Sequence, residues 1–191
     1  IFEYKSEFRF RMFSRRYMVT LMKRNKFKKI AKDVILSEIQ SLKKLRNSID
    51  KNFNKVIETI TNCKKGKIIL SGVGKSGIIA KKISSTLSSV GTPSFFVDAS
   101  SCSHGDLGQI SSNDVLILIS NSGESAELKN IIQHANRNKN ITLIGLVSRK
   151  NSLLYKNSDI KVLLPEVKEA GPGNIVPTSS TIMQLAIGDA I

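Results

Sequence analysis

Residues 115–125 read Val-Leu-Ile-Leu-Ile-Ser-Asn-Ser-Gly-Glu-Ser, so a continuous apolar run passes directly into a hydroxyl-rich turn. Apolar residues then recur at helical spacing from Ala126 to Ile132. The pattern predicts a buried strand, a turn and a helix. Such a unit aims several backbone N–H groups and the positive end of the helix dipole at one point, which favours an anion.

The turn itself is suited to bind a phosphate through neutral groups. Gly123 lets the backbone close tightly around an oxyanion, and the turn holds no Lys or Arg. Hydrogen-bond donors come from its serine hydroxyls, Ser120, Ser122 and Ser125, beside Asn121. The alternative interpretation is an ordinary serine-rich loop with one serine that caps the helix.

The rest of the chain alternates in the same way. Apolar runs at 67–70, 94–97, 115–119, 141–147 and 160–164 predict five strands. Helical patterns separate them, and a last helix is expected from about Ser179 to the end of the chain. Residues 30–60 predict one long helix or two collinear helices, because neither Gly nor Pro interrupts their apolar spacing. This order indicates an α/β fold with a parallel sheet that helices cover on both faces.

Length and composition fit one soluble domain. The chain has 191 residues, 40% of them apolar, and no apolar run approaches the roughly 20 residues that cross a bilayer. Cys63 and Cys102 show neither a pairing pattern nor a metal-ligand spacing, so we expect free thiols, a cytoplasmic location and no metal or other cofactor.

Positive charge is concentrated at the start of the chain. Residues 1–35 hold 11 of the 30 Lys and Arg but only 3 of the 15 Asp and Glu. A transit peptide, a tail for nucleic acid or anionic membrane, and translated sequence upstream of the true start are the alternatives, and we favour the last. We expect residues 1–29 to form a basic extension that is disordered or not native, and 30–191 to form the domain, with the last helix cut short at Ile191.

A second turn, Ser71-Gly-Val-Gly-Lys-Ser-Gly77, also follows a strand and opens a helix. In a parallel sheet such turns gather at the carboxyl ends of the strands, where ligands bind. Nucleotide binding is disfavoured because position 69 is Ile where the phosphate-loop motif needs Gly. Lys75 stands at the positive end of a helix dipole, an unfavourable place for a cation, which favours a ligand-facing role over a surface lysine.

Three further features are candidates for the same site. The hydroxyl cluster at 178–181 begins the last helix, and only one of its residues is needed as a cap. Glu124 and Glu127 follow the serine turn, where either could complement the helix dipole. Glu169 lies in a Gly-rich loop where no secondary structure requires it, and a carboxylate near a sugar phosphate is what proton abstraction beside a carbonyl requires.

These segments together resemble the sugar isomerase (SIS) domain, and more closely the bacterial arabinose-5-phosphate isomerases. The matching strings are GVGKSG (72–77), GTPSFFV (91–97), SHGDLG (103–108), LISNSGES-E (118–127), KEAGP (168–172) and PTSST with GDA (177–190). The resemblance implies a three-layer sandwich around a five-stranded parallel sheet in a homo-oligomer, a tetramer by family resemblance. It also implies interconversion of D-ribulose 5-phosphate and D-arabinose 5-phosphate, which supplies the Kdo sugar of lipopolysaccharide.

The resemblance carries catalytic roles over to Lys75, Glu127, Glu169 and His104. The substrate-binding residues that we predict are Gly74, Ser76, Gly91, Thr92, Ser120, Asn121, Ser122, Ser125, Thr178 and Ser179. In the mechanism that we expect, the serine turn and the 178–181 cluster hold the phosphate. One of the two glutamates then moves a proton between C1 and C2 through an enediolate, while Lys75 or His104 stabilises the developing charge. The choice between Glu127 and Glu169 stays open at this point.

The chain also departs from the family's pattern. The family's His-Pro-Gly-Gly segment and the tandem CBS modules, expected after the last helix, are not found within residues 1–191. We therefore expect either a fragment of a longer protein or a degenerate copy. The rival hypotheses are a domain that binds or senses a sugar phosphate without converting it, and a nucleic-acid-associated protein that uses the basic extension. We favour the isomerase, with a phosphorylated sugar and no nucleic acid or membrane as partner.

Overall fold

A computed structural model describes residues 26–191, and its centre is a five-stranded sheet in the order β2-β1-β3-β4-β5. All four strand pairs are parallel. The strands are β1 (Ile68–Gly72), β2 (Ser94–Phe96), β3 (Val115–Ile119), β4 (Thr142–Val147) and β5 (Ile160–Leu163). The predicted α/β class and the five-stranded parallel sheet are therefore confirmed.

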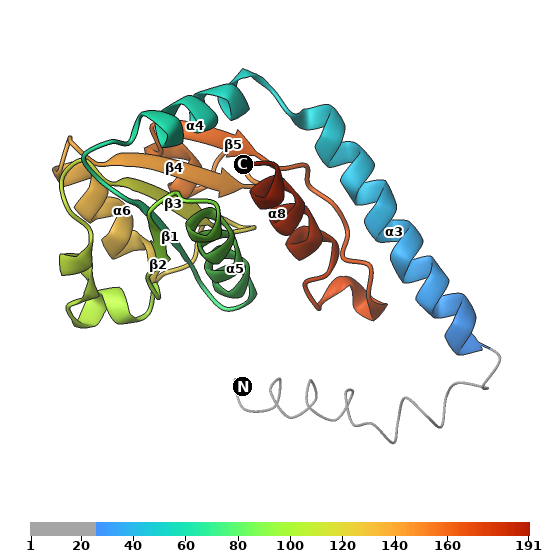
Figure 1. The fold of residues 1–191 in the computed structure, drawn as a ribbon. Helices are drawn as coiled ribbons and strands as arrows, with labels where there is room; N and C mark the ends of the chain where they lie inside the picture. Colours follow the sequence, from blue (N-terminus) through green and yellow to red (C-terminus); the bar gives the residue numbers. More distant parts are fainter. Residues whose placement is uncertain (1–25) are drawn as a thin grey trace, which may run out of the picture.

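Helices cover both faces of this sheet (Figure 1). The helices are α3 (Phe27–Ser48), α4 (Lys51–Asn62), α5 (Lys75–Ser89), α6 (Leu128–Arg137), α7 (Leu153–Asn157) and α8 (Ser179–Ala190). One core joins alternate strand residues to α4, α5 and α8, and the other joins the remaining strand residues to α6 and α7. Because both faces are covered, all five residues of β3 are buried, which explains its continuous apolar run.

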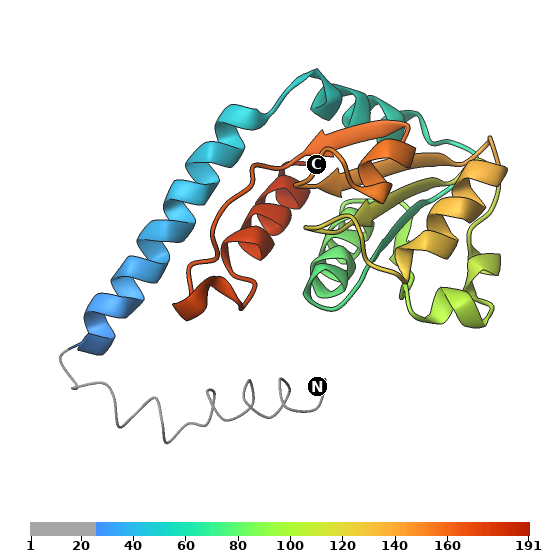
Figure 2. The same cartoon turned by 180° about the vertical axis from the view of Figure 1, so that it is seen from behind.

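The long N-terminal pattern forms two helices that meet at an angle (Figures 1 and 2). Ile49 and Asp50 are extended, and Asp50 caps α4 by accepting the Asn52 N–H at 2.8 Å. The expectation of one helix or two collinear helices is therefore wrong, because a local cap competes with helix continuation. α3 begins at Phe27, inside the predicted extension, and residues 1–25 of that extension lie outside the described residues.

Two strand-to-helix turns lie side by side at the centre of the sheet. β1 and β3 are neighbours, whereas β2 lies on the other side of β1, so the strand order reverses between β1 and β3. Gly72 pairs with Ile119 in this register. A Cβ on Gly72 would lie 2.9 Å from the Ile119 carbonyl oxygen, so the close approach of the two strand ends requires glycine. Ligands bind at such switch points in open α/β sheets.

The opposite edge of the sheet is held by an ion pair whose carboxylate is buried and whose lysine is partly exposed. Asp114, which is 1% exposed, accepts the backbone N–H groups of Lys67 at 3.0 Å and Ser111 at 2.7 Å. Its carboxylate also pairs with Lys67 Nζ at 2.8 Å. These contacts join the starts of β1 and β3 and therefore stabilise the sheet. They lie at the edge of the sheet that is opposite to the two turns. None of the helices among residues 26–191 is both long and apolar enough to span a membrane.

Candidate active site

The serine turn at 120–125 is held by its own side chains. Ser120 Oγ accepts the Gly123 N–H at 3.0 Å, and Ser122 Oγ accepts the Glu124 N–H at 3.2 Å. Asn121 is anchored to the end of β4, because its Oδ1 accepts a hydrogen bond of 2.8 Å from the Ser148 hydroxyl. A hydroxyl that accepts from the backbone keeps its own proton to donate. The turn therefore presents preorganised O–H donors.

Backbone donors are left free at the same place. α6 begins at Leu128, two residues later than the apolar spacing predicts. The N–H groups of Ser125, Ala126 and Glu127 have no acceptor among residues 26–191. Unpaired N–H groups and the dipole of a ten-residue helix together favour an anion. The turn thus has the hydrogen-bond donors that the predicted binding of a phosphate requires.

The turn after β1 contributes the second helix N-terminus. Gly74 has a φ of +58°, a conformation that favours glycine, and α5 starts at Lys75. The N–H groups of Lys75 and Ser76 find no acceptor in the described part of the chain. The Lys75 side chain is exposed and Ser76 is half-buried. Gly74, Lys75 and Ser76 are therefore brought beside the serine turn by the pairing of β1 with β3, as the sequence predicts.

The third helix N-terminus, that of α8, is already occupied. Glu169 Oε2 accepts the N–H groups of Thr178 at 2.8 Å and Ser180 at 3.1 Å. The same oxygen accepts the Thr178 hydroxyl at 3.2 Å, and Oε1 accepts the Ser180 hydroxyl at 2.5 Å. Partial burial alone would raise the pKa of Glu169, but the hydrogen bonds from Ser180 and Thr178 outweigh it and hold the pKa below its ordinary value. The carboxylate thus caps α8.

Thr178 and Ser179 of the 178–181 cluster have surroundings that the sequence did not predict. Ser179 is fully buried, and its hydroxyl has no hydrogen-bond partner within residues 26–191. Thr178 Oγ1 also accepts the Ala170 N–H at 2.8 Å, in addition to its bond to Glu169. The Thr178 hydroxyl, which was expected to bind the phosphate together with the serine turn, is therefore already bonded to Glu169 and to the loop that carries it.

The two glutamates after the serine turn differ in their contacts. Glu124 Oε1 accepts the Leu153 N–H at 2.8 Å, so Glu124 caps α7. Glu127 is exposed and makes neither a hydrogen bond nor an ion pair with any group of residues 26–191. Neither residue lies inside α6, whose first residue is Leu128. A role in complementing the α6 dipole would fit Glu124 and Glu127 equally. Their hydrogen bonds distinguish them, because only the Glu124 carboxylate has a partner.

His104 lies beside β2, outside the two turns. It belongs to the 3-10 helix η2 (Ser101–His104) and its side chain is exposed. The neighbouring Ser103 hydroxyl accepts a hydrogen bond from the Asn130 side chain of α6 at 3.1 Å, which fixes the loop on the α6 face. Burial and the nearby Asp106 and Asp98 raise the pKa of the Cys102 thiol to about 11, so this thiol stays protonated. Among residues 26–191 His104 forms no ion pair with Glu169.

Gly91 and Thr92 lie at the edge of the sheet opposite to the serine turn. The Thr92 N–H donates to the Leu87 carbonyl at the end of α5, and β2 begins two residues later. This position is the amino edge of the sheet, whereas the serine turn follows the carboxyl end of β3. The fold of one chain therefore does not bring Gly91 and Thr92 together with the serine turn, and their substrate-binding role stays a prediction.

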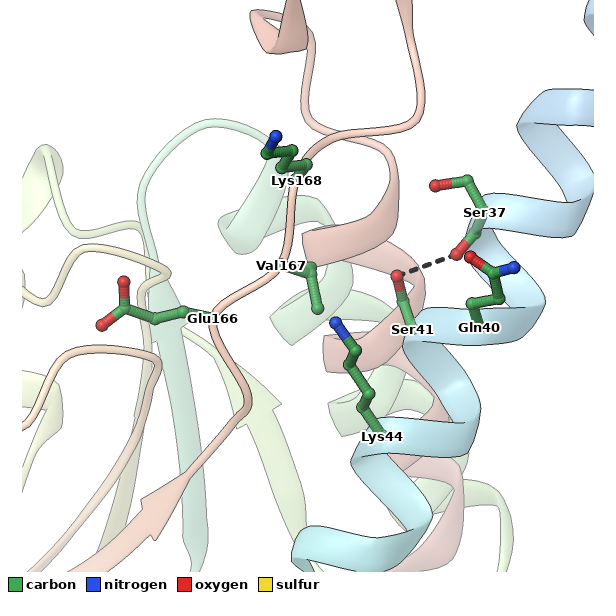
Figure 3. A pocket seen from close by; sticks show the side chains of 7 residues that line it. All are labelled: Ser37, Gln40, Ser41, Lys44, Glu166, Val167 and Lys168. Carbon is green, nitrogen blue, oxygen red and sulfur yellow. Dashed lines mark hydrogen bonds between the residues drawn. The ribbon is translucent and has the colours of Figure 1, made fainter.

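Two open grooves lie near the end of β5. One has a volume of about 560 Å³ between α3 and residues 166–168, and Figure 3 shows its polar side chains. The second, of about 430 Å³, is lined by the loops that follow β4 and β5 and includes Arg149. Through Ser148, the second groove adjoins Asn121 of the serine turn. Our sequence reasoning missed Ser148 and Arg149, although their position directly after an apolar strand was a usable signal.

Known proteins resemble this chain over most of its length. A family model described as the SIS domain matches residues 60–191. The arabinose 5-phosphate isomerase KdsD of Francisella tularensis is 46% identical over 156 residues, which are 81% of this chain and 47% of the relative. The protein of the same name from Shigella flexneri is 41% identical over 165 residues, 86% of this chain and 50% of the relative. The chain spans about half the length of these curated relatives.

A solved structure agrees with this result. An Escherichia coli CFT073 protein in complex with arabinose 5-phosphate superimposes with a TM-score of 0.83 and 36% identity, over 88% of this chain and 89% of that chain. The match of the family model and this structural agreement show that the chain belongs to the SIS domain family.

Proposed function

We propose that this chain is the sugar isomerase domain of an aldose–ketose isomerase that interconverts D-ribulose 5-phosphate and D-arabinose 5-phosphate. The observation that carries the proposal is the pair of open helix N-termini at the switch point, beside a free carboxylate on Glu127. The neutral donors of the serine turn suit a phosphoester, and the names of the relatives and the ligand of the solved neighbour support a pentose phosphate.

The chemistry needs a base, a phosphate anchor and a group that stabilises an oxyanion. With the phosphate on the serine turn, a glutamate removes a proton beside the carbonyl, and the resulting enediolate is stabilised by a cation or a hydrogen-bond donor. Lys75 has an exposed ammonium beside the serine turn and suits the last role. In the whole protein this reaction would supply the Kdo precursor of lipopolysaccharide in the cytoplasm.

We further propose that the active protein is a homo-oligomer. Within one chain Gly91 and Thr92 lie at the edge of the sheet opposite to the turns at the switch point, although we predict that both bind the substrate. A neighbouring copy would bring such residues to the site. α3 exposes Ile35, Leu36 and Ile39, each at least 43% accessible, which gives a second copy an apolar surface to cover.

The experiment that tests the proposed function is a coupled assay for ribulose 5-phosphate formed from arabinose 5-phosphate. We expect turnover with the pentose phosphate and none with the unphosphorylated sugar. The rival function is a domain that binds the sugar phosphate without converting it. The separation of Gly91 and Thr92 from the serine turn within one chain favours this rival. A rise in melting temperature with arabinose 5-phosphate but no product would establish that rival.

A further inference from the structure

We infer that Glu169 is a positioning residue that holds the first turn of α8, and that Glu127 is the catalytic carboxylate that moves the proton. This inference rests on the proposed isomerase function and deepens it. The family resemblance does not say which of the two glutamates is the base and which positions other groups, and we assign these roles to Glu127 and Glu169 respectively.

Both carboxylate oxygens of Glu169 are engaged. Oε2 accepts the Thr178 and Ser180 N–H groups and the Thr178 hydroxyl at 2.8–3.2 Å, and Oε1 accepts the Ser180 hydroxyl at 2.5 Å. A base must have a lone pair aimed at the carbon-bound proton of the substrate. An ionised carboxylate offers about four lone-pair sites, and in Glu169 only one of them, on Oε1 beside the Ser180 hydroxyl, has no donor among residues 26–191.

Protonation of Glu169 would disturb the cap. A backbone N–H cannot become an acceptor, so a proton on Oε2 would oppose the N–H groups of Thr178 and Ser180. A proton on Oε1 would require the Ser180 hydroxyl, which donates to that oxygen, to reorient at each turnover. The same hydrogen bonds hold the pKa of Glu169 below its ordinary value, which weakens it further as a base near neutral pH.

The Glu127 carboxylate, in contrast, has no hydrogen-bond or ion-pair partner among residues 26–191. Of the three glutamates that flank the two turns and the α8 cap, Glu124 is used by the Leu153 N–H and Glu169 by α8. Only Glu127 of these three has a carboxylate without a partner among residues 26–191. It lies two residues after Ser125, beside the unpaired N–H groups where the phosphate is expected. A sugar anchored there extends away from its phosphate within reach of this side chain.

The step that Glu127 performs is balanced without a cofactor. Its carboxylate takes the C2 proton of the aldose phosphate, and the C2–H electron pair forms the C1–C2 double bond while the carbonyl electrons pass to O1. The enediolate then receives the proton at C1, the O2 proton is transferred to O1, and the O2–H electrons form the C2 carbonyl. Glu169 acts only through the position of α8 and its Thr178 and Ser180 hydroxyls.

The test compares three glutamine variants of the 191-residue chain by turnover and by thermal unfolding. Glu127→Gln is expected to lower kcat by about 100-fold or more without a change in melting temperature. Glu169→Gln is expected to lower the melting temperature and raise the KM for arabinose 5-phosphate, with a smaller effect on kcat. Glu58→Gln is the matched control, because Glu58 is an exposed glutamate of α4 that lines neither of the two grooves.

The pH profile of kcat separates a base from a positioning residue. We expect the acidic limb of the wild-type profile to persist in Glu169→Gln and to vanish from the residual activity of Glu127→Gln. If Glu169→Gln does not fold, Ser180→Ala takes its place, since it removes one donor to Glu169 and leaves the carboxylate. It should show the same rise in KM with an unchanged acidic limb.

Two results would overturn the inference. The first is a Glu127→Gln variant that turns over normally, together with a Glu169→Gln variant that keeps its melting temperature and loses both turnover and the acidic limb. The second is a wild-type chain that binds arabinose 5-phosphate but neither converts it nor exchanges its C2 proton with deuterated water. That second result removes the proposed function as well, whereas the first leaves it standing.

Discussion

Glu169 and Thr178 lie nine residues apart, and the Thr178 N–H donates to Glu169 Oε2 at 2.8 Å. This bond closes the Gly-rich loop onto the start of α8. The carboxylate fills the anion-binding end of α8, whereas N–H groups at the N-termini of α5 and α6 have no acceptor among residues 26–191. We therefore expect a substrate phosphate to bind at the starts of α5 and α6.

Acid should weaken the fold through Glu169. A glutamate in the unfolded chain titrates near a pKa of about 4.3, and the hydrogen bonds of the cap lower the pKa in the folded protein. The contribution of this carboxylate to stability is therefore complete above that pH and is lost as the pH falls through the lower, folded-state pKa. Urea unfolding at about pH 6 down to about pH 3 should show a steeper loss of unfolding free energy in the wild type than in Glu169→Gln. An equal dependence of the unfolding free energy on pH in the two proteins would contradict the role of Glu169 as the cap of α8.

The serine turn should account for the affinity for phosphate. Ser122→Ala and Ser125→Ala each remove one donor and should each weaken the binding of arabinose 5-phosphate about tenfold, which corresponds to roughly 1.4 kcal/mol. Ser89→Ala is the control, because Ser89 lies at the far end of α5 and donates to the Thr86 carbonyl. Isothermal titration calorimetry measures the change. Affinities of both turn variants equal to that of Ser89→Ala would place the phosphate elsewhere.

Gly123 should tolerate no side chain. Its φ is +67°, and a Cβ there would overlap Ser152 Oγ and lie 2.9 Å from a Val147 methyl carbon. Gly123→Ala is therefore expected to cost about 2 kcal/mol of unfolding free energy, from strain and from displacement of Ser152. Gly108→Ala is the comparison, since a Cβ there meets nothing within 4 Å. Equal melting temperatures for the two variants would show that the turn adjusts freely.

The amino edge of the sheet should depend on Asp114. Asp114→Ala leaves the Lys67 ammonium without its partner and two backbone N–H groups without acceptors, so we expect a loss of about 3 kcal/mol. Asp33→Ala, at an exposed position of α3, should change stability by less than about 0.5 kcal/mol. Chemical denaturation of both variants checks this. Because Asp114 is remote from the two turns, its loss should lower stability without changing the KM of the remaining folded protein.

Local patterns were sufficient for most of the fold. The continuous apolar run at Val115–Ile119 specifies a strand buried on both faces, and the structure begins and ends β3 at these residues. The predicted turns at 71–77 and 120–125 meet because parallel strands carry their following turns to one edge. The break after α3 was missed, since apolar spacing continues through Ile49 and only the Asp50 side chain, through its bond to Asn52, ends the helix there.

Residue types and their spacing were enough to predict the fold class and the two strand-to-helix turns with their neutral hydrogen-bond donors, because each depends on groups within a few positions of one another. The tertiary structure decided which acidic group is free and which is a cap. That choice depends on contacts between Glu169 and Ser180, or Glu124 and Leu153, which lie 11 and 29 residues apart. It also placed Gly91 and Thr92 at the edge of the sheet opposite to the serine turn, because an edge of the sheet is a property of the assembled strands and not of the segment that carries the motif.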